Sequence, residues 1–320
     1  MRRSLLPAIA PVFFAASIGA ASAAPPTATA ASRAAPEQAR VPGEDPGDIV
    51  VTGERTALGE RIGAYVAALT AETANGQVAR WDRRLCLNIE GVSDAQRAFL
   101  TSALSAEARP LGVDVEAGRR CDPSAFVIFS ADPDELLARI GDSRPYFFGG
   151  IPLRMQRNLR TSRAPVRWLS FSQLRGAGGE RPTNFSTDIG KGGVEHTVPA
   201  IRSVPSRTDT PARMDVQSMV VLVDARRLAG ISNGSLGAYL SMVILGNIRP
   251  DHDVDAAVSV LGLFDEARRG DVVTAGLTEW DRAYLRSLYQ GNWNLTAGQR
   301  MARIGAAMER ELVRETAAAR

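Results

Sequence analysis

The sequence has few of the residues on which catalytic and metal-binding sites depend. Among 320 residues it has one lysine, Lys191, two histidines, His196 and His252, and two cysteines. Schiff-base, Ser-Lys and Walker chemistry would therefore all depend on Lys191. That lysine lies in "GKGG", without the G-x-x-x-x-G-K-[ST] spacing of a phosphate loop. The composition thus argues against several common enzyme classes.

An excess of charge of one sign is also missing. The formal net charge of +3 includes Arg2 and Arg3, which lie in an N-terminal segment that we expect to be removed. Without them the chain has 36 basic and 35 acidic residues, a net charge of about +1. A nearly neutral protein without basic runs gives no electrostatic reason to bind nucleic acid. We therefore expect no nucleic-acid partner.

The N-terminus has the three parts of a secretory signal. "MRRS" supplies two positive charges, Leu5–Ala20 is apolar, and "ASA" at Ala21–Ala23 offers small residues to a signal peptidase. The alternative, a retained membrane anchor, fits poorly because the apolar run is short and contains Pro7 and Pro11. We predict a signal peptide over residues 1–23. No later stretch has about 18 uninterrupted apolar residues, so we expect a periplasmic or secreted chain without a transmembrane segment.

The two cysteines, Cys86 and Cys121, are an even number in a chain expected to leave the cytosol. A disulfide between them would stabilise the fold by roughly 2–4 kcal/mol for a loop of this size. The alternative is two separate buried thiols. Two cysteines so far apart do not match the spacing of a zinc site. We expect the disulfide, within an α+β region over residues 48–175.

The first third of the chain divides into a tether and a folded region. Residues 24–47 are rich in alanine and proline and lack periodic apolar positions, which predicts a disordered tether. "DIVVTGER" at 48–55 is similar to the segment that opens the plug of TonB-dependent receptors. The chain is too short for such a barrel, so we expect a short strand or a chance likeness. Apolar spacing then predicts helices over 57–78, 93–108 and 132–140, and strands at "RLCLNIEG", "VDVEA", "AFVIFS" and "VRWLSFSQL".

The composition of the chain changes over residues 176–210, where the second half begins. This segment lacks a strong period and is rich in Gly, Ser, Thr and Pro, which predicts a mobile loop. Residues 211–320 are expected to form a strand plus helical region of the same domain, with the strand at Met214–Asp224. Three helices follow it, over 233–248, 278–289 and 296–315. The elements indicate an α+β fold with a mixed, partly antiparallel sheet, packed helices and a helical C-terminal part.

A G-x-S-x-G pattern places Ser232 where serine hydrolases carry their nucleophile. Such an elbow needs a strand that runs directly into the turn, whereas "DARRLAG" separates the predicted strand from the pattern. The histidine that follows, His252, leaves no room for the usual acid in between. Ser232 or Asn233 as a helix N-cap explains the same residues. The helix itself has no His, Asp, Glu or Cys, so it offers no metal ligand or general base.

The order of elements from Met214 to Met301 resembles that of secreted bacterial proteins related to zincin-type metallopeptidases. In that group a helix after the strand carries H-E-x-x-H or an acidic remnant, and a stretch similar to "LTEWDRAYLRSLY" at 277–289 follows. Here "YLSMVILGNI" at 239–248 replaces the ligands and the catalytic glutamate. The resemblance therefore implies a zincin-like fold without zinc catalysis, that is, a pseudoenzyme.

The histidines and one tryptophan remain as candidates. Asp251–Asp253, "DHD", is expected to be a solvated loop, because three consecutive residues cannot all face one metal without a special loop. Glu195 and His196 could approach this loop in space. Two histidines and a carboxylate could then hold zinc or act as acid and base, but no pattern argues for this. His196, in the predicted loop, and Trp293, in a turn between two helices, are the predicted contact residues.

These observations favour a binding protein over an enzyme. We expect a non-catalytic, envelope-associated binding or interaction module on a degenerate metallopeptidase-like scaffold, with no cofactor and no catalytic or metal-binding residues. Its partner would be an envelope protein or polymer. The alternative is a hydrolase that uses Ser232 with His196 or His252. That alternative requires a histidine within hydrogen-bond distance of Ser232.

Overall fold

The computed structural model describes residues 46–318 except 74–75, 83, 119–120, 144–152, 188–195, 201–211 and 293. The predicted signal peptide and all but the last two residues of the predicted tether lie outside these residues. None of the helices in the described part of the chain combines the length and apolar content needed to cross a membrane.

The first helix, α1 (Pro46–Leu69), corrects two predictions. Residues 48–55 were expected to form a short strand or to be a chance likeness, and the strand is excluded because they are helical. Pro46 lies at the first helical position, where its missing N–H costs nothing. The helix also ends well before residue 78. Past Leu69 the backbone leaves the helix, because Thr70 forms a β-bridge with Ile248 and the amide of Arg249 donates to the carbonyl of Leu69.

Five strands form one mixed sheet in the order β2-β1-β3-β7-β4. The β1–β2, β1–β3 and β3–β7 pairs are parallel, and β4 runs antiparallel to β7 at the edge. The α+β class with a partly antiparallel sheet is therefore confirmed. The strands are β1 (Arg84–Glu90), β2 (Asp114–Ala117), β3 (Ala125–Ser130), β4 (Val166–Gly176) and β7 (Ala212–Asp224).

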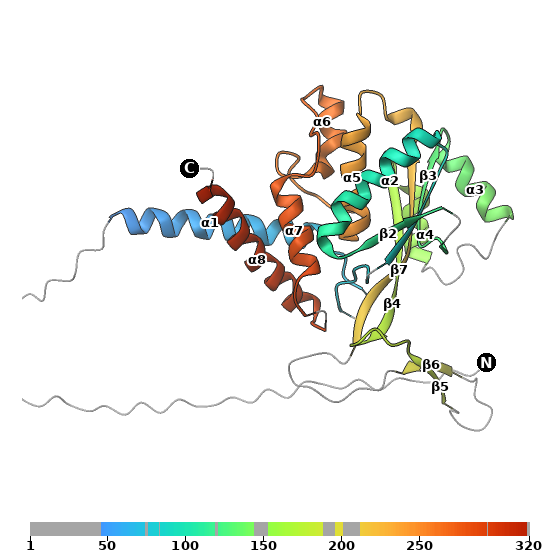
Figure 1. Cartoon of the computed structure of the whole chain (residues 1–320), viewed down its shortest axis with the longest axis horizontal. Coiled ribbons are helices and arrows are strands. Elements are labelled where there is room, and N and C mark those ends of the chain that lie inside the picture. The colour runs from blue at the N-terminus through green and yellow to red at the C-terminus, as the bar shows by residue number, and fades with distance from the viewer. Residues whose placement is uncertain are drawn as a thin grey trace, which may run out of the picture. The chain divides into compact units, whose positions relative to one another are not determined.

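Helices cover the two faces of this sheet unequally (Figure 1). One face carries the main hydrophobic core, formed with α1, α2 (Asp94–Ala108), α5 (Asn233–Gly246) and the C-terminal helices. The opposite face carries a small cluster of Leu137, Leu159, Leu169 and Leu222, which packs α3 and α4 onto β4 and β7. These two helices are α3 (Pro133–Ser143) and α4 (Leu153–Thr161).

The C-terminal part is helical, as predicted. It contains α6 (Leu263–Arg269), α7 (Glu279–Tyr289) and α8 (Ala297–Ala318). Thr278 caps α7 in a reciprocal capping box with Asp281, at the start of the helix predicted over 278–289. Short 3-10 turns lie at Arg109–Leu111, Ala225–Arg227 and Val260–Gly262.

The predicted disulfide is present and the predicted long loop is partly wrong. Cys86 in β1 is bonded to Cys121, which lies between β2 and β3. Within 176–210, β5 (Thr183–Thr187) and β6 (His196–Ala200) form a separate antiparallel pair. Both strands contain β-branched residues that favour extended backbone, a signal hidden by the surrounding glycine and serine. The remainder of the predicted loop lies largely outside the described residues.

Candidate binding edge

Strand β4 is the long edge of the sheet. It pairs with β7 over its whole length, from Val166↔Val223 to Gly176↔Ala212. Because β3 pairs with only the last six residues of β7, the rest of the β4–β7 ribbon extends past the parallel strands (Figure 1). Among the described residues, no strand pairs with the other side of β4. A strand with one unpaired side can accept hydrogen bonds from, and donate them to, another extended chain.

The two halves of β4 differ in burial. Val166–Leu169 is buried, whereas Ser170–Arg175 is half-buried or exposed, with Phe171 38% exposed. The register with β7 shifts between Phe171 and Ser172, as at a β-bulge. The first half is therefore fixed in the core, and the second half presents both backbone and side chains at the surface.

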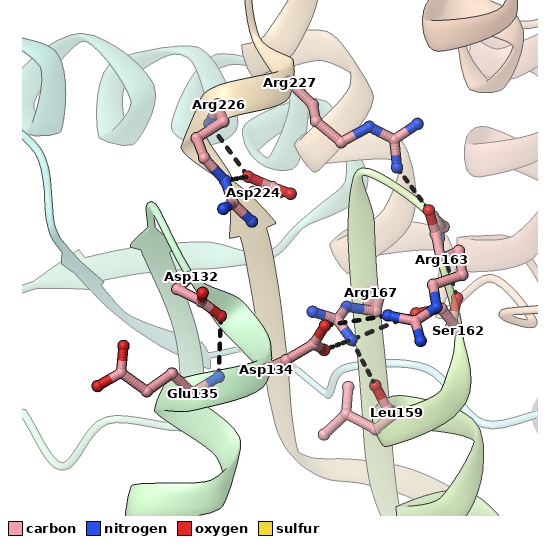
Figure 2. Close-up of polar contacts among 11 residues, drawn as sticks. Asp132, Asp134, Glu135, Leu159, Ser162, Arg163, Arg167, Asp224, Arg226 and Arg227 are labelled. Atoms are coloured by element: carbon pink, nitrogen blue, oxygen red, sulfur yellow. Dashed lines mark hydrogen bonds and ion pairs between the residues drawn. The ribbon is translucent and has the colours of Figure 1, made fainter.

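Arg167 anchors the first half of β4 on the α3/α4 face. Its side chain is only 6% exposed. The guanidinium donates to Asp134 Oδ1 at 2.7 Å and to the backbone carbonyls of Leu159 and Ser162 at 3.2 and 3.3 Å (Figure 2). These contacts join the start of β4 to α3 and to the end of α4. The buried charge is thus both paired and hydrogen-bonded, as a buried arginine must be.

The network around Arg167 lies at the carboxyl ends of β3 and β7. Arg163 pairs with the second oxygen of Asp134 at 3.1 Å, and Arg227, just after β7, donates to the carbonyl of Arg163 (Figure 2). Next to them, Arg226 pairs with Asp224 at the end of β7. The network thereby holds together three segments that are far apart in the sequence: the one after β3, the one between α4 and β4, and the one after β7. It positions the start of the edge strand β4.

Replacement of Asp134 by Asn should lower the free energy of unfolding by about 1 kcal/mol at neutral pH. The value is small because Asp134 is half exposed, so that solvent screens its ion pairs. The hydrogen bond from Arg167 lowers the pKa of Asp134 below its ordinary value. Such a carboxylate stabilises the fold above its unfolded-state pKa, about 3.9, and this stabilisation is lost as the pH falls through the folded-state pKa.

The difference between parent and Asp134→Asn should therefore be constant from roughly pH 5 to 8 and vanish as the pH falls below about 4. Urea unfolding at a series of pH values measures it. Asp142→Asn, on the exposed side of the same helix, is the matched control and should change little at neutral pH. A difference that stays the same or grows on acidification would contradict the assignment.

Trp168 anchors β4 on the opposite face. Its indole is 4% exposed and donates from Nε1 to the carbonyl of Ile248 at 2.7 Å, just past the end of α5. His252 stacks on the indole with ring centroids 5.7 Å apart, and its Nδ1 lies 3.1 Å from the carbonyl of Arg249. Burial lowers the pKa of His252. Trp168 thus ties the edge strand to the end of the buried helix.

Further aromatic donors bind the last carbonyls of α5. Trp81 Nε1 donates to Ile244 O at 2.8 Å, and Tyr289 OH donates to Leu245 O at 2.9 Å. The last four carbonyls of a helix have no partner within the helix, so a buried helix end needs such donors. Side chains from two separate segments therefore close the C-terminal end of α5, and Trp168 binds the carbonyl of Ile248 just past it.

The structure does not bring Ser232 and His252 together. Ser232 is the N-cap of α5, accepting from the amide of Ser235 at 3.0 Å, and its Oγ lies 2.9 Å from Ser235 Oγ. His252 lies past the other end of this 14-residue helix, which is roughly 21 Å long. A proton transfer between them would need hydrogen-bond distance. Ser232 therefore has the capping role that the sequence also allowed.

The other predicted candidates contribute no described cluster. Asp251 forms two hydrogen bonds with Arg249, at 2.8 and 2.9 Å, which lower the pKa of its carboxyl. His196 begins β6, but its side chain lies outside the described part of the chain, as do Lys191 and Trp293. Among the residues that are described, no group of three His, Cys, Asp or Glu side chains could hold a metal ion.

Sequence reasoning missed the importance of β4. The stretch "VRWLSFSQL" was correctly predicted to be a strand, but nothing local shows that it is an edge strand. Its partner, β7, lies more than 35 residues further along the chain. The available signal was Arg167 in an otherwise apolar strand start, since a buried arginine needs partners from elsewhere in the fold.

Comparisons with protein-family models, with curated proteins and with solved structures found no match for this chain.

Proposed function

We propose that the chain is a non-catalytic binding module of the periplasm or extracellular space, on a degenerate metallopeptidase-like scaffold, that takes an extended polypeptide segment along β4. The observation that carries the proposal is the long edge strand itself. Its first half is held rigid by Arg167 and Trp168, and its second half is accessible. Strand addition at a preformed edge is a common way to bind peptides.

The arrangement after β7 supports the scaffold part of the proposal. The strand is followed by the buried helix α5, and the "LTEWDRAYLRSLY" stretch begins just before α7, in the order that the resemblance implies. Zincin ligation needs two histidines one turn apart and a glutamate on the same helix. In α5 every residue from Ser235 to Gly246 is buried, and none is an acid or a histidine. Such a helix serves as core.

The disulfide supports the location. Disulfides persist in oxidising compartments and are rare in the cytosol. The Cys86–Cys121 bond and the predicted signal peptide both favour a chain that acts outside the cytoplasm. An envelope protein that presents an extended segment is the kind of partner this location and this edge would select.

The second half of β4 offers both sources of binding energy that strand addition uses. Its outer backbone groups would form main-chain hydrogen bonds, which give affinity, while alternating side chains give selectivity. Phe171 is the exposed apolar side chain of this half, whereas Leu174 is half-buried against the main core. A bound segment would cover Phe171, so an apolar residue is expected in the partner at the position opposite it.

Photo-crosslinking from position 171 in the native envelope, followed by mass spectrometry, tests the proposal. The captured segment would then be synthesised and its affinity for the purified chain measured. Phe171→Glu should weaken binding roughly tenfold or more, because burial of the phenyl ring on binding is lost. Phe99→Glu is the matched control, since Phe99 is 46% exposed on α2, and it should leave the affinity unchanged.

Hydrogen exchange locates the bound peptide. The peptide should slow amide exchange in residues 170–176, whereas the other edge strand, β2, should exchange as before. Protection confined to segments other than β4, or equal loss of affinity in the two phenylalanine variants, would overturn the proposal.

A further inference from the structure

The nearly neutral total charge conceals a strongly basic segment. Residues 143–179 contain no aspartate or glutamate, although the whole chain has a formal net charge of only +3. The seven arginines of the segment are Arg144, Arg154, Arg157, Arg160, Arg163, Arg167 and Arg175. The rest of the chain therefore carries a net charge of −4. Four of these arginines recur at every third position, so they form no contiguous basic run.

The fold places part of this segment on one exposed surface. Helix α4 buries Leu159, which is 2% exposed, in the small cluster beneath it. The other side of the helix exposes Leu153, Arg154, Arg157 and Arg160. Leu153, Arg154 and Arg157 together form the α4 basic face. Leu153, 76% exposed, is among the most exposed large apolar side chains described.

Little on the protein neutralises the α4 basic face. The helix has no acidic residue. Among the described residues, neither Arg154 nor Arg157 forms an ion pair, although Asp251 lies close enough to Arg154 to interact with it electrostatically. Nearby, Arg163 is 85% exposed even though it pairs with Asp134. Positive charge thus gathers on a helix whose first residue is an exposed leucine.

We propose that the α4 basic face docks the protein onto an anionic lipid surface. Guanidinium groups bind phosphate oxygens bidentately, and anionic bilayers attract basic side chains additively. The exposed Leu153 beside the arginines matches helices that lie in the membrane interface, which combine a basic face with apolar side chains. The disulfide favours a compartment in which nucleic acid is not the usual polyanion. The inference goes beyond the proposed peptide binding and uses different residues.

Vesicle sedimentation tests the inference. The purified chain without residues 1–23, the predicted signal peptide, is mixed with phosphatidylcholine vesicles that either lack or contain phosphatidylglycerol. We expect binding only to the anionic vesicles at low ionic strength, and its loss in about 0.5 M salt. Each neutralised arginine should cost about fivefold in affinity, so Arg154→Gln with Arg157→Gln should weaken binding roughly 25-fold.

The matched control removes two exposed arginines from α8, by Arg303→Gln with Arg310→Gln. It should retain nearly all of the vesicle binding, because α8 is not part of the α4 basic face. Equal loss in both double variants would show a nonspecific charge effect and overturn the proposal. So would failure of the parent chain to bind anionic vesicles.

A second arm separates lipid from other polyanions. Leu153→Ser should weaken binding to anionic vesicles and leave any binding to single-stranded DNA unchanged, since only the bilayer offers an apolar interior. If DNA at the same phosphate concentration binds as tightly as the vesicles and Leu153→Ser has no effect on either, the partner is a soluble polyanion and the lipid proposal fails.

Discussion

Replacement of Asp281 by Ala should lower the free energy of unfolding by about 4 kcal/mol. The carboxylate is fully buried and accepts four hydrogen bonds. Oδ1 accepts from Tyr65 OH and Ser259 Oγ, both at 2.7 Å, and Oδ2 accepts from the amides of Val260 and Thr278, both at 2.9 Å. The variant leaves three buried donors and one half-buried donor, the amide of Thr278, without this acceptor. Each unsatisfied buried donor costs about 1–3 kcal/mol before relaxation.

The size of the effect follows from what the carboxylate joins. Its donors belong to α1, to the segment that enters the turn at Val260, and to the N-cap of α7. Tyr65 also packs edge-on against Trp280 and Tyr284, so loss of its hydrogen bond would loosen an aromatic cluster. A single side chain therefore connects the first helix to the C-terminal helices.

Urea unfolding followed by circular dichroism measures the change. Asp281→Asn should cost less, roughly 2 kcal/mol, because the amide oxygen of the asparagine can still accept two of the four hydrogen bonds. Some cost remains because the NH2 group of the asparagine then faces the backbone amide donors. Tyr65→Phe removes one donor and should cost about 1 kcal/mol. Asp253→Ala, in an exposed loop, serves as the control, with a change within about 0.5 kcal/mol. A free energy of unfolding for Asp281→Ala within about 1 kcal/mol of the parent value would show that the four hydrogen bonds do not stabilise the fold together.

Local sequence signals were sufficient where a helix carried both a period and a cap. The helix predicted from residue 278 does begin there, because the capping box of Thr278 and Asp281 acts between residues three apart. Similarly, Ser93 and the apolar spacing after it predicted α2. The strands β3 and β7 were found because their apolar runs are flanked by turn residues. In each case the physical cause lies within a few residues of the element.

The candidate site could not be found in this way, because its properties are non-local. Whether β4 is central or at an edge depends on its pairing with β7 and on the absence of a second described neighbour. The partner of Arg167, Asp134, lies 33 residues before it. Residues 48–55 show the opposite case. Their likeness to a receptor plug segment left a short strand or a chance likeness open, but no described strand pairs with them, and a helix that begins at Pro46 incorporates them.

The α4 basic face shows a third kind of limit. Total charge was read correctly as nearly neutral, and contiguous basic runs are indeed missing. The arginines at every third position become neighbours only once residues 153–161 form a helix. They then lie together at the surface because the opposite side of the helix, with Leu159, packs against the sheet. The net charge of the whole chain cannot reveal that basic residues are concentrated in one segment. The net charge of a short sequence window, considered together with a predicted helix in that window, can.

Removal of the disulfide should have an effect of similar size to the loss of Asp281. The bond closes a loop between Cys86 and Cys121, which are 35 positions apart in the sequence. Chain-entropy arguments give about 4 kcal/mol for the restriction that a loop of this length places on the unfolded state. For a domain of this size, that loss lowers the melting temperature by about 8–16 °C. Cys86→Ala with Cys121→Ala is the appropriate variant, because Cys86 is buried and a serine hydroxyl there could lack a partner.

Because of its position, the disulfide should also stabilise one strand, β2, more than the rest of the sheet. Strand β2 is an edge strand of four residues with mostly exposed side chains, so it has little burial to hold it against β1. The disulfide ties the end of the β2–β3 connection to β1 beside it. Without the bond, amide exchange in β2 should accelerate far more than in β3, which lies between β1 and β7. Reduction of the disulfide in the parent chain should reproduce both the lower stability and the faster amide exchange in β2. If global stability falls but β2 exchange is unaltered, the disulfide acts only by restricting the unfolded state.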